Sequence, residues 1–304
     1  MDWTKAIQLA QLVNAAYDVF AGKSAVTPGY DVLATIYAND LATDKNPDGG
    51  RSRVIMGLVL QAQGSGNAVV AIRGTVGILE WVQDVRFGLK PFTSVPGAGN
   101  TEDGFTDMYL SMTLGQAAGA ASVVNSLPSI PWRRPVTSLA ICGHSLGGAL
   151  VTLLALDVAA NTAAPFNKPI VYTYASPKTG DPAFVQKYNQ LVTGTIRTAI
   201  DPDLVPKLPP SPYEHVCDPI PLKAFTLIPP KLLVQPNPYC WHILSSYLYL
   251  MSQEAGGEIL PPAAACAPPA GIEGILEGLR TKVSDVRGLI EEFASAAPAK
   301  LGGS

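Results

Sequence analysis

One five-residue stretch constrains the fold of this chain more than any other, the Gly-His-Ser-Leu-Gly at residues 143–147. A short apolar run at 136–142 precedes it and a long apolar pattern at 146–160 follows it. The first is typical of a buried strand and the second of a buried helix. Glycines on both sides of a serine let the chain turn sharply, because side chains there would collide. The sequence therefore predicts a strand, a strained turn at Ser145 and a helix.

A serine held at such a junction is well placed to act as a nucleophile. The turn lifts its side-chain oxygen above the sheet, and the first amides of the helix point to where negative charge would develop during attack. The alternative interpretation is a tight turn whose serine only caps the helix. The surrounding strand and helix favour the nucleophile.

The composition limits the class of protein. The chain has 304 residues, of which 47% are hydrophobic and 15% are charged. This suits one large α/β domain, or a domain with a small appendage. The net charge of −3 and the absence of a basic stripe argue against nucleic acid as a partner. No apolar run reaches the roughly 18 residues of a membrane span. The N-terminus does not read as a signal peptide. No Cys/His spacing resembles a zinc site, and we expect no metal or cofactor.

Strands and helices should alternate along most of the chain. The strands we expect are short apolar runs at residues 32–37, 54–61, 68–73, 138–142, 170–175 and 195–200. The helices we expect lie at residues 3–20, 104–126, 146–160, 181–191 and 243–251. Residues 64–67 favour a hairpin between two of the strands. The pattern predicts a mostly parallel central sheet with an antiparallel edge hairpin and helices on both faces.

Composition also suggests domain boundaries. We expect a catalytic domain at 1–260, a Pro/Ala-rich linker at 261–270 and an amphipathic helix and tail at 271–304. The apolar stripe of the last segment favours docking on its own domain, with dimerisation as the alternative. A proline-rich irregular segment at 206–238 is long enough to be functional.

The cysteines give a weaker signal. We expect Cys142 to be a core residue of its strand. A disulfide between Cys217 and Cys240 would brace the proline-rich segment, although the pairing among Cys217, Cys240 and Cys266 does not follow from the sequence.

A serine nucleophile needs a base, and the base needs an acid to orient it. The chain has three histidines. His144 adjoins the serine and points elsewhere, so we expect it to pack or hydrogen-bond beneath the turn. His242 follows the last predicted strand on a loop, which is the usual position of the base in such hydrolases. His215 is the alternative.

The acid should follow a strand between the serine and the base in chain order. Asp201 and Asp203 both follow the strand predicted at 195–200. A solvated turn aspartate is the alternative for either residue. The local sequence favours neither of them.

Several motifs, in order, resemble those of the class 3 lipase family, which includes the fungal triacylglycerol lipases. The likeness runs from about residue 14 to 251. The motifs are AIRGT at 71–75 for F-R-G-S/T, EWVQD at 80–84 for W-x-x-D, GF at 104–105, GHSLGGA at 143–149, TYASPKTGD at 173–181 for T-F/Y-G-x-P-R-x-G-N/D, and DLVPKLPP at 203–210 for D-x-V-P-x-L-P-P. Ala175 and Lys178 depart from the pattern, and the histidine that often precedes Gly104 is absent.

This resemblance implies an α/β-hydrolase fold and a set of site residues. The family's acid precedes x-V-P, which selects Asp203. Thr75 and Leu146 would form the oxyanion hole, and Asp84 and Trp81 would support the Thr75 loop. A secreted protein is also what the family favours.

Together these observations predict a serine hydrolase that cleaves carboxylic esters of lipids through an acyl-enzyme. Two apolar segments would meet a lipid–water interface or pack on the body of the protein. One is the stripe at 78–89, which corresponds to a lid in the family, and the other is 224–234. A carboxylesterase for phenolic or other non-lipid esters shares the same fold and triad. The third alternative is a catalytically inactive lipid-binding or scaffold protein.

Overall fold

The computed structural model describes residues 1–40, 52–75, 87–117, 120–222, 238–258 and 260–261. The chain forms two compact units. The larger unit comprises residues 1–199 and 205–220, and the smaller one comprises 200–204 and the chain from 221 on.

A mixed sheet is the centre of the larger unit. Its strands are β1 (Tyr30–Asn39), β2 (Arg53–Ala62), β3 (Asn67–Ile72), β6 (Thr113–Leu114), β7 (Ser138–His144), β8 (Ile170–Tyr174) and β9 (Gly194–Ile200). They follow the order β9-β8-β7-β3-β2-β1-β6. The pairs from β3 to β9 are parallel, whereas β3–β2, β2–β1 and β1–β6 are antiparallel. The α/β class, the parallel sheet and the antiparallel hairpin predicted from the sequence are therefore confirmed.

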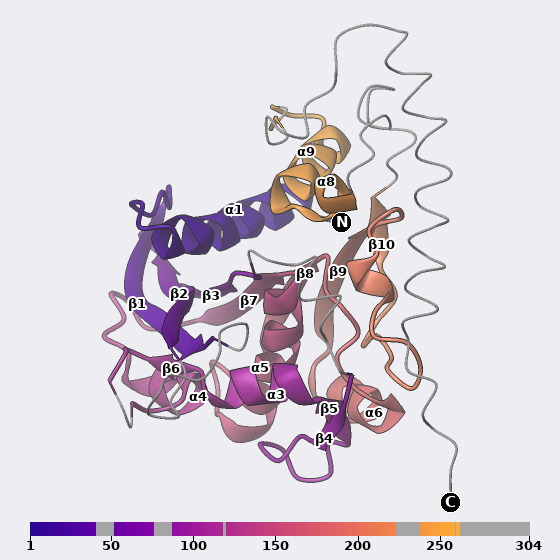
Figure 1. The fold of residues 1–304 in the computed structure, drawn as a ribbon. Coiled ribbons are helices and arrows are strands. Elements are labelled where there is room, and N and C mark those ends of the chain that lie inside the picture. Colours follow the sequence, from indigo (N-terminus) through magenta and orange to yellow (C-terminus); the bar gives the residue numbers. More distant parts are fainter. Residues whose placement is uncertain (41–51, 76–86, 118–119, 223–237, 259, 262–304) are drawn as a thin grey trace, which may run out of the picture. The chain divides into compact units, whose positions relative to one another are not determined.

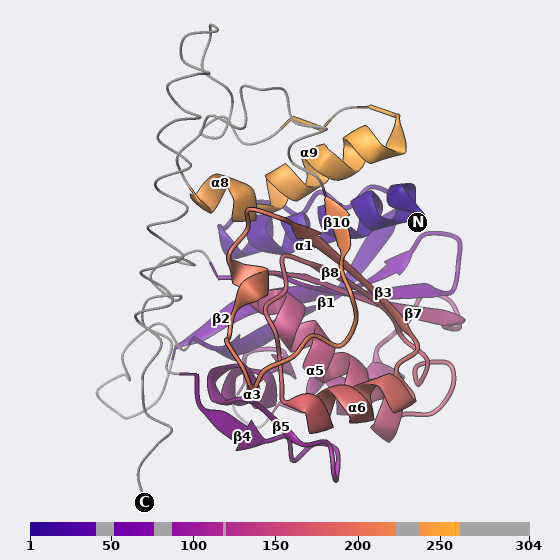
Figure 2. The ribbon, with the colours of Figure 1, turned by 90° about the vertical axis from the view of Figure 1, so that its right-hand side faces the viewer.

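Helices cover both faces of this sheet. Helix α1 (Trp3–Phe20) lies on one face, and α3 (Asp103–Leu110), α5 (Leu146–Asn161) and α6 (Pro182–Leu191) lie on the other (Figure 1, Figure 2). Helix α5 is apolar around its whole circumference, and its residues from Leu146 to Val158 are all buried. A helix of this kind needs neighbours on every side, so α5 forms the centre of the core beneath β7. Cys142 is fully buried, as predicted.

Shorter elements complete the described chain. The larger unit also contains the ribbon β4 (Leu89–Pro91) and β5 (Asn100–Glu102), helix α4 (Val123–Ser126) and the 3₁₀ turns Leu127–Ser129 and Val205–Lys207. Strand β10 (Ile220–Leu222) begins at the last residue of the larger unit. Helices α8 (Pro238–His242) and α9 (Leu244–Ala255) belong to the smaller unit. In the part of the chain that the structure describes, no helix is both long and apolar enough to cross a membrane.

One predicted helix was wrong, and one of the cysteine pairings that the sequence left open is excluded. The helix expected at 104–126 ends at Leu110, and the chain then pairs with β1 as strand β6 before Gly115 takes a left-handed φ of 87°. The Cys217–Cys240 disulfide is absent because Cys217 is a free thiol, while Cys240 is disulfide-bonded. Residues 262–304 of the expected linker and C-terminal helix lie outside the described residues, as do the 224–234 segment and most of the 78–89 stripe.

Candidate active site

Ser145 occupies a strained turn between β7 and α5. Its φ of 58° and ψ of −129° are rare for a residue with a side chain. The flanking glycines make the turn possible, because a β-carbon at Gly143 would lie 2.3 Å from the Gly147 carbonyl oxygen. A β-carbon at Gly147 would lie 2.4 Å from the carbonyl oxygen of Arg73, at the end of β3. The turn therefore packs directly against the neighbouring strand.

The serine hydroxyl is not used to hold the fold together. Ser145 is fully buried, and its Oγ has no hydrogen-bond partner among the described residues. It stands at the N-cap of α5 without making a side-chain capping bond, so the capping interpretation is wrong. A strained backbone and an uncommitted polar atom both cost stability, and the two together are typical of functional sites.

The end of β3 lies against this turn. A β-carbon at Gly74, the residue that precedes Thr75, would be 2.8 Å from the Ser145 Cβ. The Leu146 amide is in the first turn of α5, where backbone N–H groups have no intrahelical partner. Leu146 thus follows Ser145 directly, and Thr75 follows a glycine that packs against the serine.

Tyr17 of α1 links these two segments. Its hydroxyl accepts a hydrogen bond from the Gly74 N–H at 2.8 Å and is hydrogen-bonded to His144 Nδ1 at 2.8 Å. His144 is therefore tied by a hydrogen bond to a side chain of α1. Tyr17 could not be recognised as a site residue from the sequence, because its position on α1 fits the apolar face of the helix equally well.

Arg73 holds the end of β3 from the other side. Its guanidinium donates to the carbonyls of Ile55 and Gly74, both at 2.6 Å, and lies 3.6 Å from the centre of the Phe20 ring. Burial lowers the pKa of Arg73 to about 10, which still leaves it charged at neutral pH. The Gly74 peptide is therefore held at both its N–H and its carbonyl.

The smaller unit holds an acid–histidine pair. Asp203 and His242 are both buried, and His242 Nδ1 lies 3.0 Å from each Asp203 carboxylate oxygen. Because a carboxylate only accepts, Nδ1 is the protonated nitrogen, and in the neutral ring Nε2 is then the basic one. His242 is the last residue of α8, so the loop position expected for it was wrong.

Tyr247 of α9 fixes this acid. Its hydroxyl donates to Asp203 Oδ2 at 2.7 Å and accepts from the Ile200 N–H at 3.2 Å. Tyr247 is fully buried, so both bonds are shielded from water. From the sequence, this residue could be recognised only as a member of an apolar helix.

The competing candidates have other surroundings. His215 bonds through Nε2 to the Pro206 carbonyl at 2.6 Å. Burial, with the nearby charge of Arg197, lowers the pKa of His215 to about 4, so it is a weak base. Asp201 is exposed, which fits the solvated turn. Trp81 and Asp84 lie outside the described residues. No three His, Cys, Asp or Glu side chains in the described chain are grouped so that they could hold a metal ion.

The parallel sheet, the strained serine at the end of its central strand and the buried helix behind it define an α/β-hydrolase. Comparison with known proteins gives the family. Residues 69–213 match the model of the family described as lipase (class 3). This segment of the chain therefore belongs to the class 3 lipases, as the motifs indicated.

Individual relatives agree with this assignment. The chain is 30% identical over 207 residues to phospholipase A1-IIgamma of Arabidopsis thaliana, which covers 61% of this chain and 48% of that protein. It is 31% identical over 142 residues to secreted mono- and diacylglycerol lipase 1 of Fusarium solani, covering 47% of this chain and 39% of that one. The chain thus spans about half the length, or less, of these curated relatives.

Solved structures support the fold. The Rhizomucor miehei lipase in its propeptide complex aligns with a TM-score of 0.55 at 23% identity, covering 72% of this chain and 68% of that one. The nonglycosylated LIP2 lipase of Yarrowia lipolytica aligns with a TM-score of 0.55 at 18% identity, covering 72% and 79%. At these identities the likeness establishes the fold alone.

Proposed function

We propose that this protein hydrolyses carboxylic esters, with Ser145 as nucleophile, His242 as base and Asp203 as the acid that orients it. The observation that carries the proposal is the strained, buried Ser145, whose hydroxyl has no hydrogen-bond partner in the described chain. The Asp203–His242 hydrogen bonds support it, since they fix the tautomer in which His242 accepts a proton at Nε2.

The chemistry would proceed in two steps. His242 takes the proton of Ser145 while the serine oxygen attacks the ester carbonyl, and the Thr75 and Leu146 amides stabilise the oxyanion. His242 then protonates the leaving alcohol, which leaves an acyl group on the serine. A water molecule, activated by the same histidine, releases the acid and restores the enzyme.

We propose lipid esters as the substrate class. The support is the class 3 lipase family together with the relatives named as phospholipases A1 and as a mono- and diacylglycerol lipase. These names differ in the ester that they specify. An assay must therefore decide which lipids are the substrate: acylglycerols, phospholipids or triacylglycerols. The substrate would be taken from a lipid–water interface.

The test is Ser145→Ala, with Ser138→Ala on the same strand as the matched control. Ser138 is exposed, and its loss should leave hydrolysis of p-nitrophenyl esters unchanged. Ser145→Ala should lower kcat by at least about 1,000-fold with the same circular dichroism spectrum. A fluorophosphonate probe should label the wild type and the control but not Ser145→Ala. Full activity or full labelling of that variant would exclude the proposed nucleophile.

Substrate class needs a second assay. Initial rates on p-nitrophenyl esters of increasing chain length, triacylglycerol emulsions and phosphatidylcholine vesicles should favour the long-chain lipids. A steep rise in rate when a short-chain ester passes its solubility limit would support action at an interface. Preference for water-soluble phenolic esters would instead identify a carboxylesterase.

A further inference from the structure

A cavity lies in the larger unit, at the opposite end of α5 from Ser145. Its volume is about 410 Å³, which is within the usual range for small-molecule sites. Asp157 lines it, and at about 1.5 Å of rise per residue the helix separates Asp157 from Ser145 by roughly 18 Å. The cavity is therefore distinct from the candidate active site.

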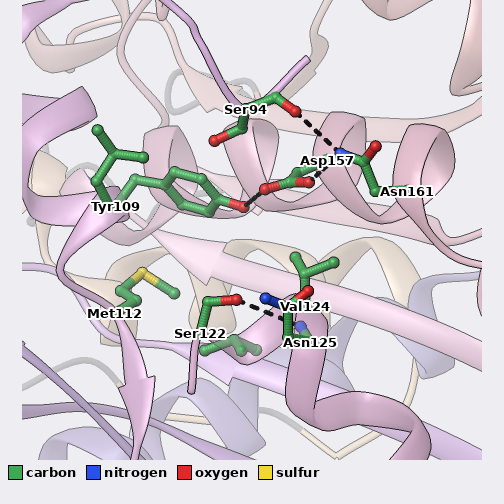
Figure 3. Close-up of a pocket in the computed structure, with 10 residues that line it drawn as sticks. Ser94, Tyr109, Met112, Ser122, Val124, Asn125, Asp157 and Asn161 are labelled. Carbon is green, nitrogen blue, oxygen red and sulfur yellow. Dashed lines mark hydrogen bonds between the residues drawn. The ribbon is translucent and has the colours of Figure 1, made fainter. Parts of the chain in front are cut away.

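The residues that line this cavity include one charged side chain, Asp157, beside neutral hydroxyl and amide groups. Asp157 is only 9% exposed, and its carboxylate accepts hydrogen bonds from the Tyr109 hydroxyl and from Asn161 Nδ2. Asn161 also donates to the Ser94 carbonyl at 3.0 Å. Figure 3 shows these side chains along one wall, with Ser122 and Asn125 opposite them.

The Asp157 carboxylate has neutral partners. No ion pair of Asp157 is formed within the described chain. Burial, together with the charge of Asp157, raises the pKa of Tyr109 well above its usual value, so the phenol remains a neutral donor. The last turn of α5 adds the negative end of its dipole. A buried carboxylate at a helix C-terminus without a cation is electrostatically incomplete.

The rest of the lining indicates what kind of cation would fit. Leu110, Met112, Val123 and Val124 contribute apolar surface to the same cavity. A bare metal ion gains nothing from such walls, whereas an alkylated ammonium group is stabilised both by the carboxylate and by apolar contact. We propose that this cavity binds a small organic cation, a quaternary or primary ammonium group, with Asp157 as its counter-ion and Ser122 and Asn125 beside its polar substituents.

Choline is the probe, and 3,3-dimethyl-1-butanol is its uncharged analogue of the same shape. Titration calorimetry on the full chain should show saturable binding of choline and at least about tenfold weaker binding of the alcohol. Equal binding of the two compounds, or no saturable binding of choline, would overturn the proposal.

Variants locate the site. Asp157→Asn should weaken choline binding at least about tenfold, whereas Asp107→Asn, which removes an exposed carboxylate on α3, should leave it unchanged. Because Asp157→Asn alters a buried contact, Asn125→Lys provides an independent test: it adds an ammonium group at the exposed wall and should abolish binding. Binding that survives in both variants would refute the site.

The source of the cation is settled by competition. Phosphatidylcholine vesicles that displace choline from the wild type would assign a lipid headgroup, whereas phosphatidylglycerol vesicles should not displace it. Retention of choline in the presence of both vesicles would assign the free cation. Displacement by phosphatidylglycerol as effective as that by phosphatidylcholine would contradict recognition of the ammonium group.

Discussion

Glu102 should make the stability of this protein fall as the pH rises. It ends β5, is only 2% exposed, and accepts the Phe105 N–H at 2.6 Å as the N-cap of α3. Burial is the main reason that its pKa is raised from 4.5 to about 8, with a further contribution from the neighbouring Asp103. The native carboxyl group is therefore protonated at neutral pH.

The sign and the size follow from proton linkage. The folded state holds a proton that the unfolded chain releases above about 4.5, so this contribution to stability is complete at lower pH and is lost as the pH rises towards 8. Each pH unit in that window is worth about 1.4 kcal/mol, which gives a loss of order 3 kcal/mol at pH 7. Above pH 8 the loss should level off.

Glu102→Gln separates this effect from all others. The amide keeps the size and the N-cap oxygen but cannot ionise, so the variant should lie close to the wild type at pH 5 and be more stable by roughly 4 kcal/mol at pH 8. Urea unfolding followed by tryptophan fluorescence across this range measures the difference. The exposed Glu214→Gln is the control and should show no such trend. A Glu102→Gln difference that stays constant with pH would refute the burial argument.

Two further predictions concern the site. Tyr247→Phe should lower kcat about tenfold, because a hydrogen bond to a charged group contributes roughly 1.5–3 kcal/mol. Tyr17→Phe should weaken inhibition by a phosphonate ester by a similar factor, with little change in KM. Unchanged kcat and unchanged inhibition would make both phenols purely structural. Ala175, buried with a φ of 55°, should tolerate glycine. In thermal unfolding, Ala155→Gly in helix α5 should lower the free energy of unfolding by at least about 1 kcal/mol more than Ala175→Gly does.

The sequence predicted the features that local pattern determines. The strand, turn and helix around Ser145 were found because their periodicity and glycines are contiguous in the chain. The helix expected at 104–126 failed because its apolar residues fit more than one structure, and the pairing of Thr113 with β1 is long-range. The choice of Asp203 over Asp201 needed the family resemblance, since both follow the same strand.

Hydrogen bonds between distant residues were beyond sequence reasoning. Tyr17 and Tyr247 read only as members of apolar helices, because the bonds that give them a role join positions far apart in the chain. The burial that shifts Glu102 likewise has no local signature. The sequence could suggest the candidate catalytic residues, but it could not suggest the groups that hold them.

The two phenols point to a common way of building the site within each unit. In the larger unit, Tyr17 joins the backbone N–H of Gly74, just beyond β3, to His144 under the turn. In the smaller unit, Tyr247 joins the backbone N–H of Ile200, at the end of β9, to the Asp203 carboxylate. In both cases a hydroxyl from a helix connects a strand end to a site residue. Because these bonds form without substrate, the reorganisation needed during the reaction is small, which is the condition under which electrostatic stabilisation of a transition state is most effective.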